Sequence, residues 1–265
     1  MRFIQTFAGH LPIRLLFLVV CGLFSLNVFS AGEVGSVVFA KGAISAQDAT
    51  GAPRLLARNS PIYQNDTIVT ARKSFAVIKF VDDTKMSIRP NSEITIDRFN
   101  ASPGEETAEF SIVKGGLRAL TGAIGNRKPE NVRFRTREAS IGIRGTDLAI
   151  RICEDDECWI EELALSNFEP VKTNCLTRMD KLPPGEFIVV FSGAIVTGND
   201  AGKEIEMEAI AAAYASEEEL TCLAYVSRFL VHDEFLNQVH KTGFYLELDE
   251  ILGTSGDVDA ACEIL

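Results

Sequence analysis

The run Ile141-Gly142-Ile143-Arg144-Gly145-Thr146-Asp147-Leu148-Ala149-Ile150 places a polar tetrapeptide between two short apolar pieces. Each apolar piece is typical of a strand, and the polar tetrapeptide between them is typical of a tight turn. Gly145 can adopt backbone angles that are closed to other residues, and threonine and aspartate side chains can hydrogen-bond neighbouring backbone groups. The run therefore predicts a corner in a β protein, with a structural role for Arg144, Gly145, Thr146 and Asp147.

This interpretation predicts how two substitutions at the corner should act. Gly145→Val should disturb folding, because a β-branched residue resists positive φ and crowds a close backbone approach. Asp147→Asn should be milder, because the amide oxygen can still accept a hydrogen bond.

Short alternating runs separated by turn residues surround this corner, from Val34 to about Ile152. One example is the pair of runs Ala76–Phe80 and Met86–Ile88, which flank Asp82-Asp83-Thr84 as the arms of a hairpin. Turn signals recur every eight to twelve residues, with no helical segment between them, which is typical of all-β domains. We expect a mainly β fold, either a β-sandwich or a solenoid-like stack of short hairpin strands.

The pattern changes after about residue 210. Ser216-Glu217-Glu218-Glu219 matches a helix capping box, with serine at the N-cap and glutamate three residues later. Apolar residues then recur near helical spacing, and Gly243 would end the pattern. We expect a β domain over residues 31–210 and a helical C-terminal segment over residues 211–265.

The first thirty residues are typical of an export signal. Arg2 and Arg14 precede or begin an apolar run, Leu15–Phe24, that is shorter than the roughly 18 residues of a membrane span. Small residues at Ser30 and Ala31 offer a cleavage point. We expect residues 1–30 to be a cleaved signal peptide, with an uncleaved anchor as the alternative, and a periplasmic or secreted mature protein without a membrane span.

The charge of the chain is acidic, at −11. Removal of residues 1–30 takes away two arginines and no acid, which leaves 24 basic against 37 acidic residues and a net charge of −13. Nucleic-acid binding needs clustered lysine and arginine to neutralise phosphates. The composition therefore disfavours nucleic acid and anionic membrane surfaces as partners.

Five cysteines would remain after cleavage. Cys153 and Cys158 enclose four acidic residues, Glu154 to Glu157. Two thiolates without a nearby histidine are a poor zinc pattern, whereas an exported protein retains disulfides. We expect a Cys153–Cys158 disulfide and no metal site; the pairing of Cys175, Cys222 and Cys262 is left open, with Cys175–Cys222 as a weaker guess.

Catalytic side chains are scarce. His232 and His240 fall in the expected helical segment, and ordinary surface positions explain them. Ser111 and Lys114 have Ser-x-x-Lys spacing, but a strand would point the two side chains to opposite faces. No phosphate-binding glycine loop occurs, since the glycines at 115 and 116 lack a following helix. We therefore predict no catalytic residue and no cofactor.

Several pieces of the sequence, taken in order, resemble the FecR domain family. They span about residues 34–152 and comprise the hairpin opening at Gly35-Ser36-Val37 and Gly42-Ala43-Ile44, the strand approach Asp66–Ala71, the hairpin Phe75–Ile88, Asn91-Ser92-Glu93-Ile94, Val113–Arg118 and the closing Ile141–Ile150. In the hairpin, Asp83 stands where the family prefers glycine, so a different turn geometry is one expectation.

The resemblance implies a non-catalytic module outside the cytoplasm. Signalling members of the family join this domain through a membrane span to a cytoplasmic anti-sigma domain, and they read the state of an outer-membrane receptor. We expect neither part in this chain and do not carry the sigma-regulation role over. The resulting hypothesis is an exported binding or structural module that contacts a protein or cell-envelope component; the alternative is an exported hydrolase with an unrecognised site.

Overall fold

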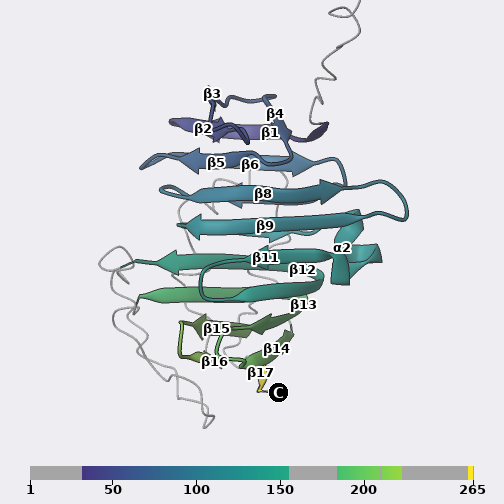
Figure 1. Ribbon diagram of the computed structural model, residues 1–265, viewed down its shortest axis with the longest axis vertical. Helices are drawn as coiled ribbons and strands as arrows, with labels where there is room; N and C mark the ends of the chain where they lie inside the picture. The colour runs from purple at the N-terminus through teal and green to yellow at the C-terminus, as the bar shows by residue number, and fades with distance from the viewer. Residues whose placement is uncertain (1–31, 155–183, 209–210, 223–261, 265) are drawn as a thin grey trace, which may run out of the picture. The chain divides into compact units, whose positions relative to one another are not determined.

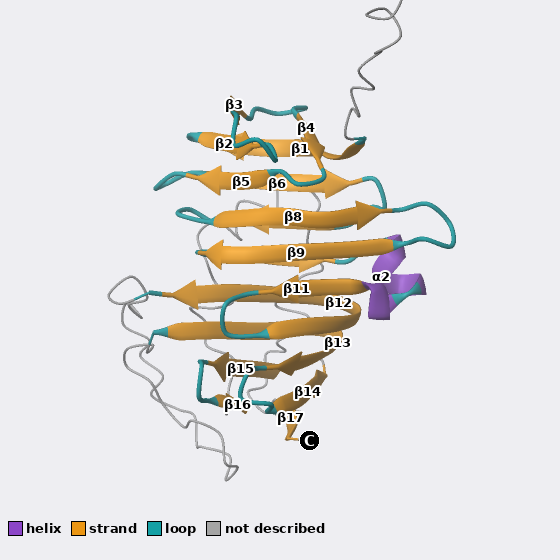
Figure 2. Cartoon of the chain, viewed as in Figure 1, coloured by secondary structure: helices purple, strands orange, loops and turns teal. Residues whose placement is uncertain are grey.

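Strands make up most of the computed structural model, which describes residues 32–154, 184–208, 211–222 and 262–264 (Figure 2). All of the described residues belong to one compact unit, Gly32–Leu265. No helix in the described part of the chain has the length and apolarity needed to cross a bilayer. The expectation of a mainly β fold is confirmed.

The strands form one hydrogen-bonded sheet that folds back on itself as two layers. The order of strands in the first layer is β4 (Pro61–Tyr63), β1 (Glu33–Lys41), β6 (Phe75–Phe80), β7 (Lys85–Ile88), β10 (Gly116–Leu120), the second half of β12 (Ser140–Cys153), the first half of β13 (Gly185–Gly198), β15 (Ala211–Ala215) and β16 (Leu220–Cys222). All neighbours in this layer are antiparallel, and Figure 1 shows the strands stacked side by side.

The second layer is built in the same way. Its strand order is β3 (Pro53–Leu55), β2 (Ile44–Gln47), β5 (Thr67–Thr70), β8 (Glu93–Asn100), β9 (Thr107–Lys114), β11 (Val132–Arg135), the first half of β12, the second half of β13, β14 (Glu204–Glu208) and β17 (Cys262–Ile264). Only the β9–β11 pair among these is parallel. The long strands β12 and β13 therefore belong to both layers.

The chain passes between the layers at two opposite edges. At the first edge, for example, β9 turns at Gly115 into β10. Gly116 pairs with Arg151 at that end of β10, whereas Leu120 pairs with Asp147 at the other end. The bend of β12 at residues 144–147 therefore lies at the second edge, on the far side of the molecule from the first.

The core fills the space between the two layers. Phe80 of the first layer stacks on Phe99 of the second with ring centroids 5.0 Å apart, and it meets Phe110 edge-on at 5.4 Å. Phe110 in turn stacks on Phe134 at 5.1 Å. All four side chains are at least 96% buried, and burial of each such side chain contributes about 1.5–3 kcal/mol. This aromatic contact is the physical link that holds the two layers face to face.

Two short helices interrupt the strands, although the sequence indicated no helical segment in this region. α2 (Ala123–Arg127) and the 3-10 helix η1 (Pro129–Asn131) connect β10 to β11. Ile124 of α2 is fully buried. The connection therefore closes the second edge with apolar cover rather than leaving it as an open loop.

The expected start of the C-terminal helical segment is wrong. Residues 211–215 and 220–222 are strands β15 and β16, and the sequence Ser216–Glu219 forms the turn between them. The Ser216 N–H donates to the Glu219 carbonyl at 2.7 Å, and the Glu219 N–H donates to Ser216 Oγ at 3.1 Å. In this hairpin turn, the serine hydroxyl accepts the same kind of hydrogen bond that it would accept at a helix N-cap. Residues 223–261 of the expected segment lie outside the described residues.

Candidate functional site: the corner at Arg144–Asp147

The predicted corner exists as a bend within one strand. Ile141 and Ile143 of β12 pair with Thr197 and Ile195 in the second layer. Beyond the corner, Leu148 pairs with Val190 in the first layer, and the register shifts between Arg144 and Leu148. The two apolar pieces therefore do not pair with each other; each enters a different layer.

Thr146 is the hydrogen-bonding centre of this bend. Its hydroxyl donates to the Ala194 carbonyl at 2.7 Å and accepts from the Arg144 N–H at 3.1 Å. The Thr146 N–H donates to Thr121 Oγ1 at 2.9 Å, and the Thr121 N–H donates to the Thr146 carbonyl at 3.0 Å. Thr146 is 1% exposed, so its polar groups need these partners. The bonds fix the β12 bend against both β13 and the end of β10.

Two glycines allow the bends of β12 and β13 to stack. Gly145 has φ +56°, and a Cβ there would lie 3.2 Å from Asn126 Oδ1. Gly193, at the bend of β13, has φ +81°, and a Cβ there would overlap the Gly145 carbonyl oxygen. Glycine alone meets both conditions without strain. The positive φ expected at Gly145 is therefore present.

A buried ion pair joins the corner to β10. Arg118 Nε and Nη2 donate to the two carboxylate oxygens of Asp147 at 2.8 and 2.6 Å. Arg118 is 1% exposed, and its guanidinium lies 4.0 Å from the centroid of the Phe191 ring. This two-pronged geometry is the strong form of a charge-assisted hydrogen bond. Arg118 and Phe191 are members of the corner that the sequence did not identify.

Arg144 differs from the other three corner residues because its side chain points to solvent. It is 67% exposed, and its Nη1 lies 3.2 Å from Glu206 Oε1 on β14. An exposed ion pair of this kind contributes little to stability. Arg144 is therefore the one side chain of the tetrapeptide that a partner could contact.

A second polar cluster supports the corner from the β6–β7 turn. Asp82 accepts hydrogen bonds from the Thr84 N–H at 2.9 Å and the Ile124 N–H at 3.3 Å, and Thr84 Oγ1 accepts from the Gly122 N–H at 2.8 Å. Asp83 has φ +67°, the left-handed conformation that glycine favours. The turn therefore keeps the backbone shape of a glycine-containing turn, and the expected departure in geometry is absent.

Side chains with possible catalytic chemistry have structural partners or lie outside the described residues. Ser111 Oγ donates to Asp97 Oδ2 at 2.6 Å on the outer side of β9, and Lys114 is exposed at the end of that strand. His232 and His240 lie outside the described residues, as do Asp155 and Asp156.

Cys153 is buried and disulfide-bonded, and so is Cys222. Cys158, Cys175 and the side chain of Cys262 lie outside the described part of the structure. The Cys153–Cys158 pairing therefore stays a prediction.

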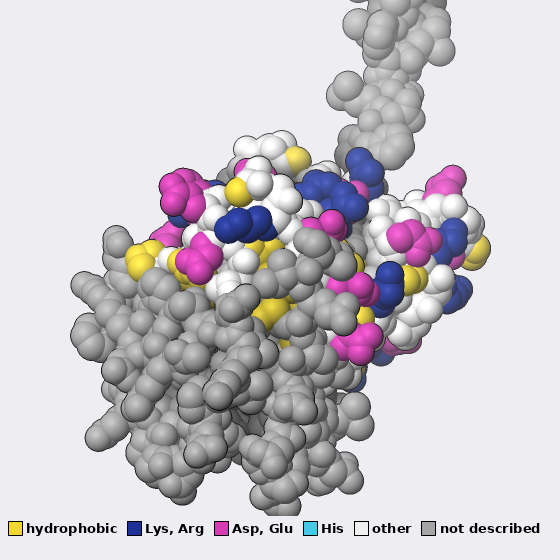
Figure 3. Space-filling view, turned by 90° about the horizontal axis from the view of Figure 1, so that it is seen from below, with side chains coloured by type: hydrophobic (Ala, Val, Ile, Leu, Met, Phe, Trp, Pro, Cys, Tyr) yellow, Lys and Arg dark blue, Asp and Glu magenta, His cyan; other side chains and the backbone are white. Residues whose placement is uncertain are grey.

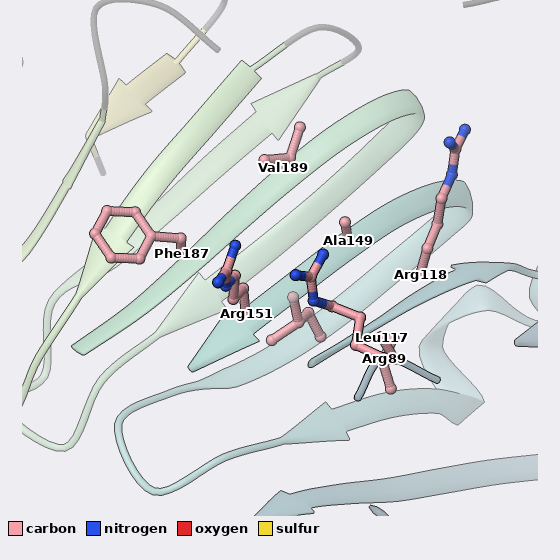
Figure 4. A pocket seen from close by; sticks show the side chains of 8 residues that line it. Arg89, Leu117, Arg118, Ala149, Arg151, Phe187 and Val189 are labelled. Atoms are coloured by element: carbon pink, nitrogen blue, oxygen red, sulfur yellow. The ribbon is translucent and has the colours of Figure 1, made fainter. Parts of the chain in front are cut away.

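Two of the cavities in the described region bear on ligand binding. The first, of about 10 Å³, has room for one water at most, and Figure 4 shows arginine side chains along it from neighbouring strands. Burial lowers the pKa of one of them, Arg89, to about 10. The second, of about 410 Å³, lies between the β8–β9 loop and η1 and is lined by charged and polar residues. A hydrogen bond from Lys128 lowers the pKa of Glu106 there to about 2. Neither cavity contains the apolar walls typical of an enclosed substrate site together with a catalytic pair.

Comparison with known proteins gives one family. The model described as "FecR protein" matches residues 66–161, from Asp66 through the corner. The earlier pieces of the resemblance, before Asp66, fall outside the matched range. No curated protein matches the chain.

Solved structures with some likeness are distant. One described as a cell surface anchoring domain is 27% identical over 23% of this chain and 82% of its own, with a TM-score of 0.23. Two structures of a candidate anti-sigma factor from Parabacteroides distasonis ATCC 8503 each cover 61% of both chains, at 9% and 10% identity and TM-scores of 0.42 and 0.41. All three scores are too low to define the fold or function of this chain.

Two motif residues named from the sequence have structural roles within the matched range. Asp66 pairs with Arg54 and accepts the Tyr63 N–H at 2.7 Å, and Ser92 Oγ accepts the Gly116 N–H at 2.9 Å. Residues 66–161 of the chain therefore match the FecR family model.

Proposed function

We propose that this chain is an exported, non-catalytic FecR-type module that binds a protein or cell-envelope partner through a rigid β surface. The observation that carries the proposal is that the buried corner residues are engaged in hydrogen bonds within the fold. Thr146 and Asp147 are buried and hydrogen-bonded to β10, β13 and Arg118, so they stabilise the fold and have no free group for chemistry. Binding must then use the exposed residues that this frame positions.

The outer side of the second layer is the surface that best suits this role. We call it the outer polar face, and its members on adjacent strands are Thr67, Thr95, Glu109, Ser111, Arg133 and Arg135. Side chains alternate along these strands between buried and partly or fully exposed. The face is therefore broad, polar and held by a packed core beneath it.

Charges on this face are mixed rather than of one sign. Arg135 Nη1 lies 3.4 Å and Arg98 Nη1 lies 3.7 Å from the Glu109 carboxylate. Figure 3, which views the molecule from below, shows basic and acidic side chains interspersed among the described residues visible there. A mixed pattern suits a protein surface, where specificity comes from complementary charges, and it does not suit the phosphates of nucleic acid.

The free strand edge at β3 and β4 is less suited to binding an added strand. β3 has three residues and begins with Pro53, which has no N–H to donate. On β4, the Pro61 carbonyl already accepts from Arg54 Nη2 at 3.2 Å. Short, proline-containing edges protect a sheet against pairing with other chains. The outer polar face is accordingly preferred over this edge.

Site-specific photo-crosslinking tests this proposal. A crosslinking residue placed at Arg133, on the outer polar face, should give a defined adduct in native envelopes. The matched position is Leu55 on the β3 edge, which is 84% exposed and should give none. An adduct from position 55 alone would contradict the choice of face, and retention of the chain in the cytoplasm would contradict the exported role.

A further inference from the structure

Three buried oxygen atoms without a hydrogen-bond partner gather at the first edge. Among the described residues, four buried side-chain polar atoms lack a partner: Glu138 Oε2, Glu186 Oε1, Thr197 Oγ1 and, elsewhere, Arg54 Nη1. Most buried polar atoms in folded proteins are satisfied, so such a group calls for an explanation.

The register of β13 places Glu186 and Thr197 opposite each other. Glu186 pairs with Ile152 in the first layer and Thr197 pairs with Ile141 in the second, and both side chains alternate with core residues. The strand bends near Ser192, which is about equally far along the chain from both. Their side chains therefore enter the same end of the space between the layers.

Glu138 reaches this place from the loop between β11 and β12. Thr136 Oγ1 bonds to Glu186 Oε2 and accepts the Ala139 N–H at 2.9 Å and the Glu138 N–H at 3.2 Å. The loop of the second layer is thus tied to the first layer through one hydroxyl. Glu138 Oε1 accepts from Arg137 Nε at 2.8 Å, which leaves Oε2 without a partner.

In the described part of the structure, Arg137 is the one cation that forms an ion pair with either carboxyl group. Arg137 contacts Glu138 but is 80% exposed. Burial raises the pKa of Glu186 to about 8, and the neighbouring Glu138 adds to this effect. No cluster of metal-binding side chains occurs in the described residues, and neither cavity is lined by these residues. A bound proton, unlike a metal ion or a water molecule, does not require a cavity.

Among the described residues, a tyrosine and three glutamates are the other titratable groups that face this place. Tyr214 of β15 donates its hydroxyl to the Pro184 carbonyl at 2.8 Å, and burial raises its pKa. The charges of Glu154 and Glu217 face Arg137, and that of Glu219 faces Tyr214; all three glutamates are exposed. Glu186 is therefore the group at this place whose pKa is raised into the range near neutral pH.

We propose that the buried Glu186 carboxyl group, tied to the 136–139 loop through Thr136 and unpaired at Oε1, holds a proton in the folded chain and is a pH-sensitive latch closing the first edge. Loss of the proton leaves two adjacent buried carboxylates, which repel each other. The loop at residues 136–139 would then separate from β13. The inference is independent of the partner that the outer polar face binds.

Chemical denaturation of the purified chain, with disulfides intact, tests the latch between pH 5 and 8.5. The folded state holds one proton more than the unfolded state in this range, because the pKa of Glu186 is higher when folded. The equilibrium constant for unfolding should therefore rise with pH, by up to about tenfold per pH unit. Glu186→Gln should remove this slope, and at pH 8 it should unfold less readily than the wild type. The control Glu204→Gln, at an exposed position, should keep the wild-type slope.

Parallel pH profiles for the wild type and Glu186→Gln would overturn the proposal. A second measurement covers the case in which the variant does not fold. Infrared spectra of the wild type at pH 6.5 should show the carbonyl band of a protonated carboxyl group, and the band should fade toward pH 8.5. Absence of that band at pH 6.5 would equally overturn the proposal.

Discussion

Asp147→Asn should be strongly destabilising, because it removes the carboxylate charge that pairs with buried Arg118. The sequence alone suggested a mild effect, since an amide oxygen still accepts a hydrogen bond. The structure corrects this expectation: Arg118 is 1% exposed and donates twice to Asp147, at 2.8 and 2.6 Å. Removing one partner of a buried ion pair costs about 3–5 kcal/mol. Phe191, 4.0 Å from the guanidinium, offsets only part of that loss.

Urea denaturation at pH 7 measures this cost, and a double-mutant cycle assigns it. Arg118→Met alone should also be destabilising, because it leaves Asp147 buried without its cation. The double variant Arg118→Met with Asp147→Asn should lose less than the sum of the two single losses, because it leaves no unpaired charge. A loss below about 1 kcal/mol for Asp147→Asn, or strictly additive losses, would refute the reasoning from the buried pair.

Three further predictions address other features. Gly145→Val should lose about 1–3 kcal/mol in the same denaturation assay, since φ is +56° and a Cβ meets Asn126; a fully stable variant would contradict the strained-corner interpretation. Peptide mapping without reduction should find Cys153 joined to Cys158, with a stabilisation at or below the low end of about 2–4 kcal/mol because the loop is small; Cys158 recovered as a free thiol would exclude the pairing. Amino-terminal sequencing of the exported protein should begin near Ala31 or Gly32, and recovery of residues 1–30 in a membrane fraction would favour the anchor.

The sequence predicted local features well wherever they depend on neighbours in the chain. The hairpin at Asp82–Thr84 is present as expected. It follows from turn residues and from alternation of apolar and polar positions. The bend at Arg144–Asp147 is also where the tetrapeptide placed it.

Features that depend on distant residues were not predictable. Arg118 and Asp147 are 29 positions apart, and only the β10–β12 register brings them together. Glu138 and Glu186 come to the same edge because β11, β12 and β13 close it. The Ser216–Glu219 motif was misleading for a physical reason: a serine oxygen that accepts an N–H three residues later is common to a helix N-cap and to this turn. The preceding segment Ala211–Ala215 is buried throughout, and it forms a strand rather than a helix.

The position of the signature in the fold explains its residue types better than a catalytic role would. Both β12 and β13 bend from one layer into the other at the same edge. These two stacked bends need glycine at 145 and 193, a buried hydroxyl that joins the Arg144 N–H to the Ala194 carbonyl, and a carboxylate to hold the arginine of β10. Each requirement is met by one residue type, and Arg144 alone remains exposed. Under the binding role proposed above, contacts with a partner would therefore come from Arg144 and from residues outside the signature.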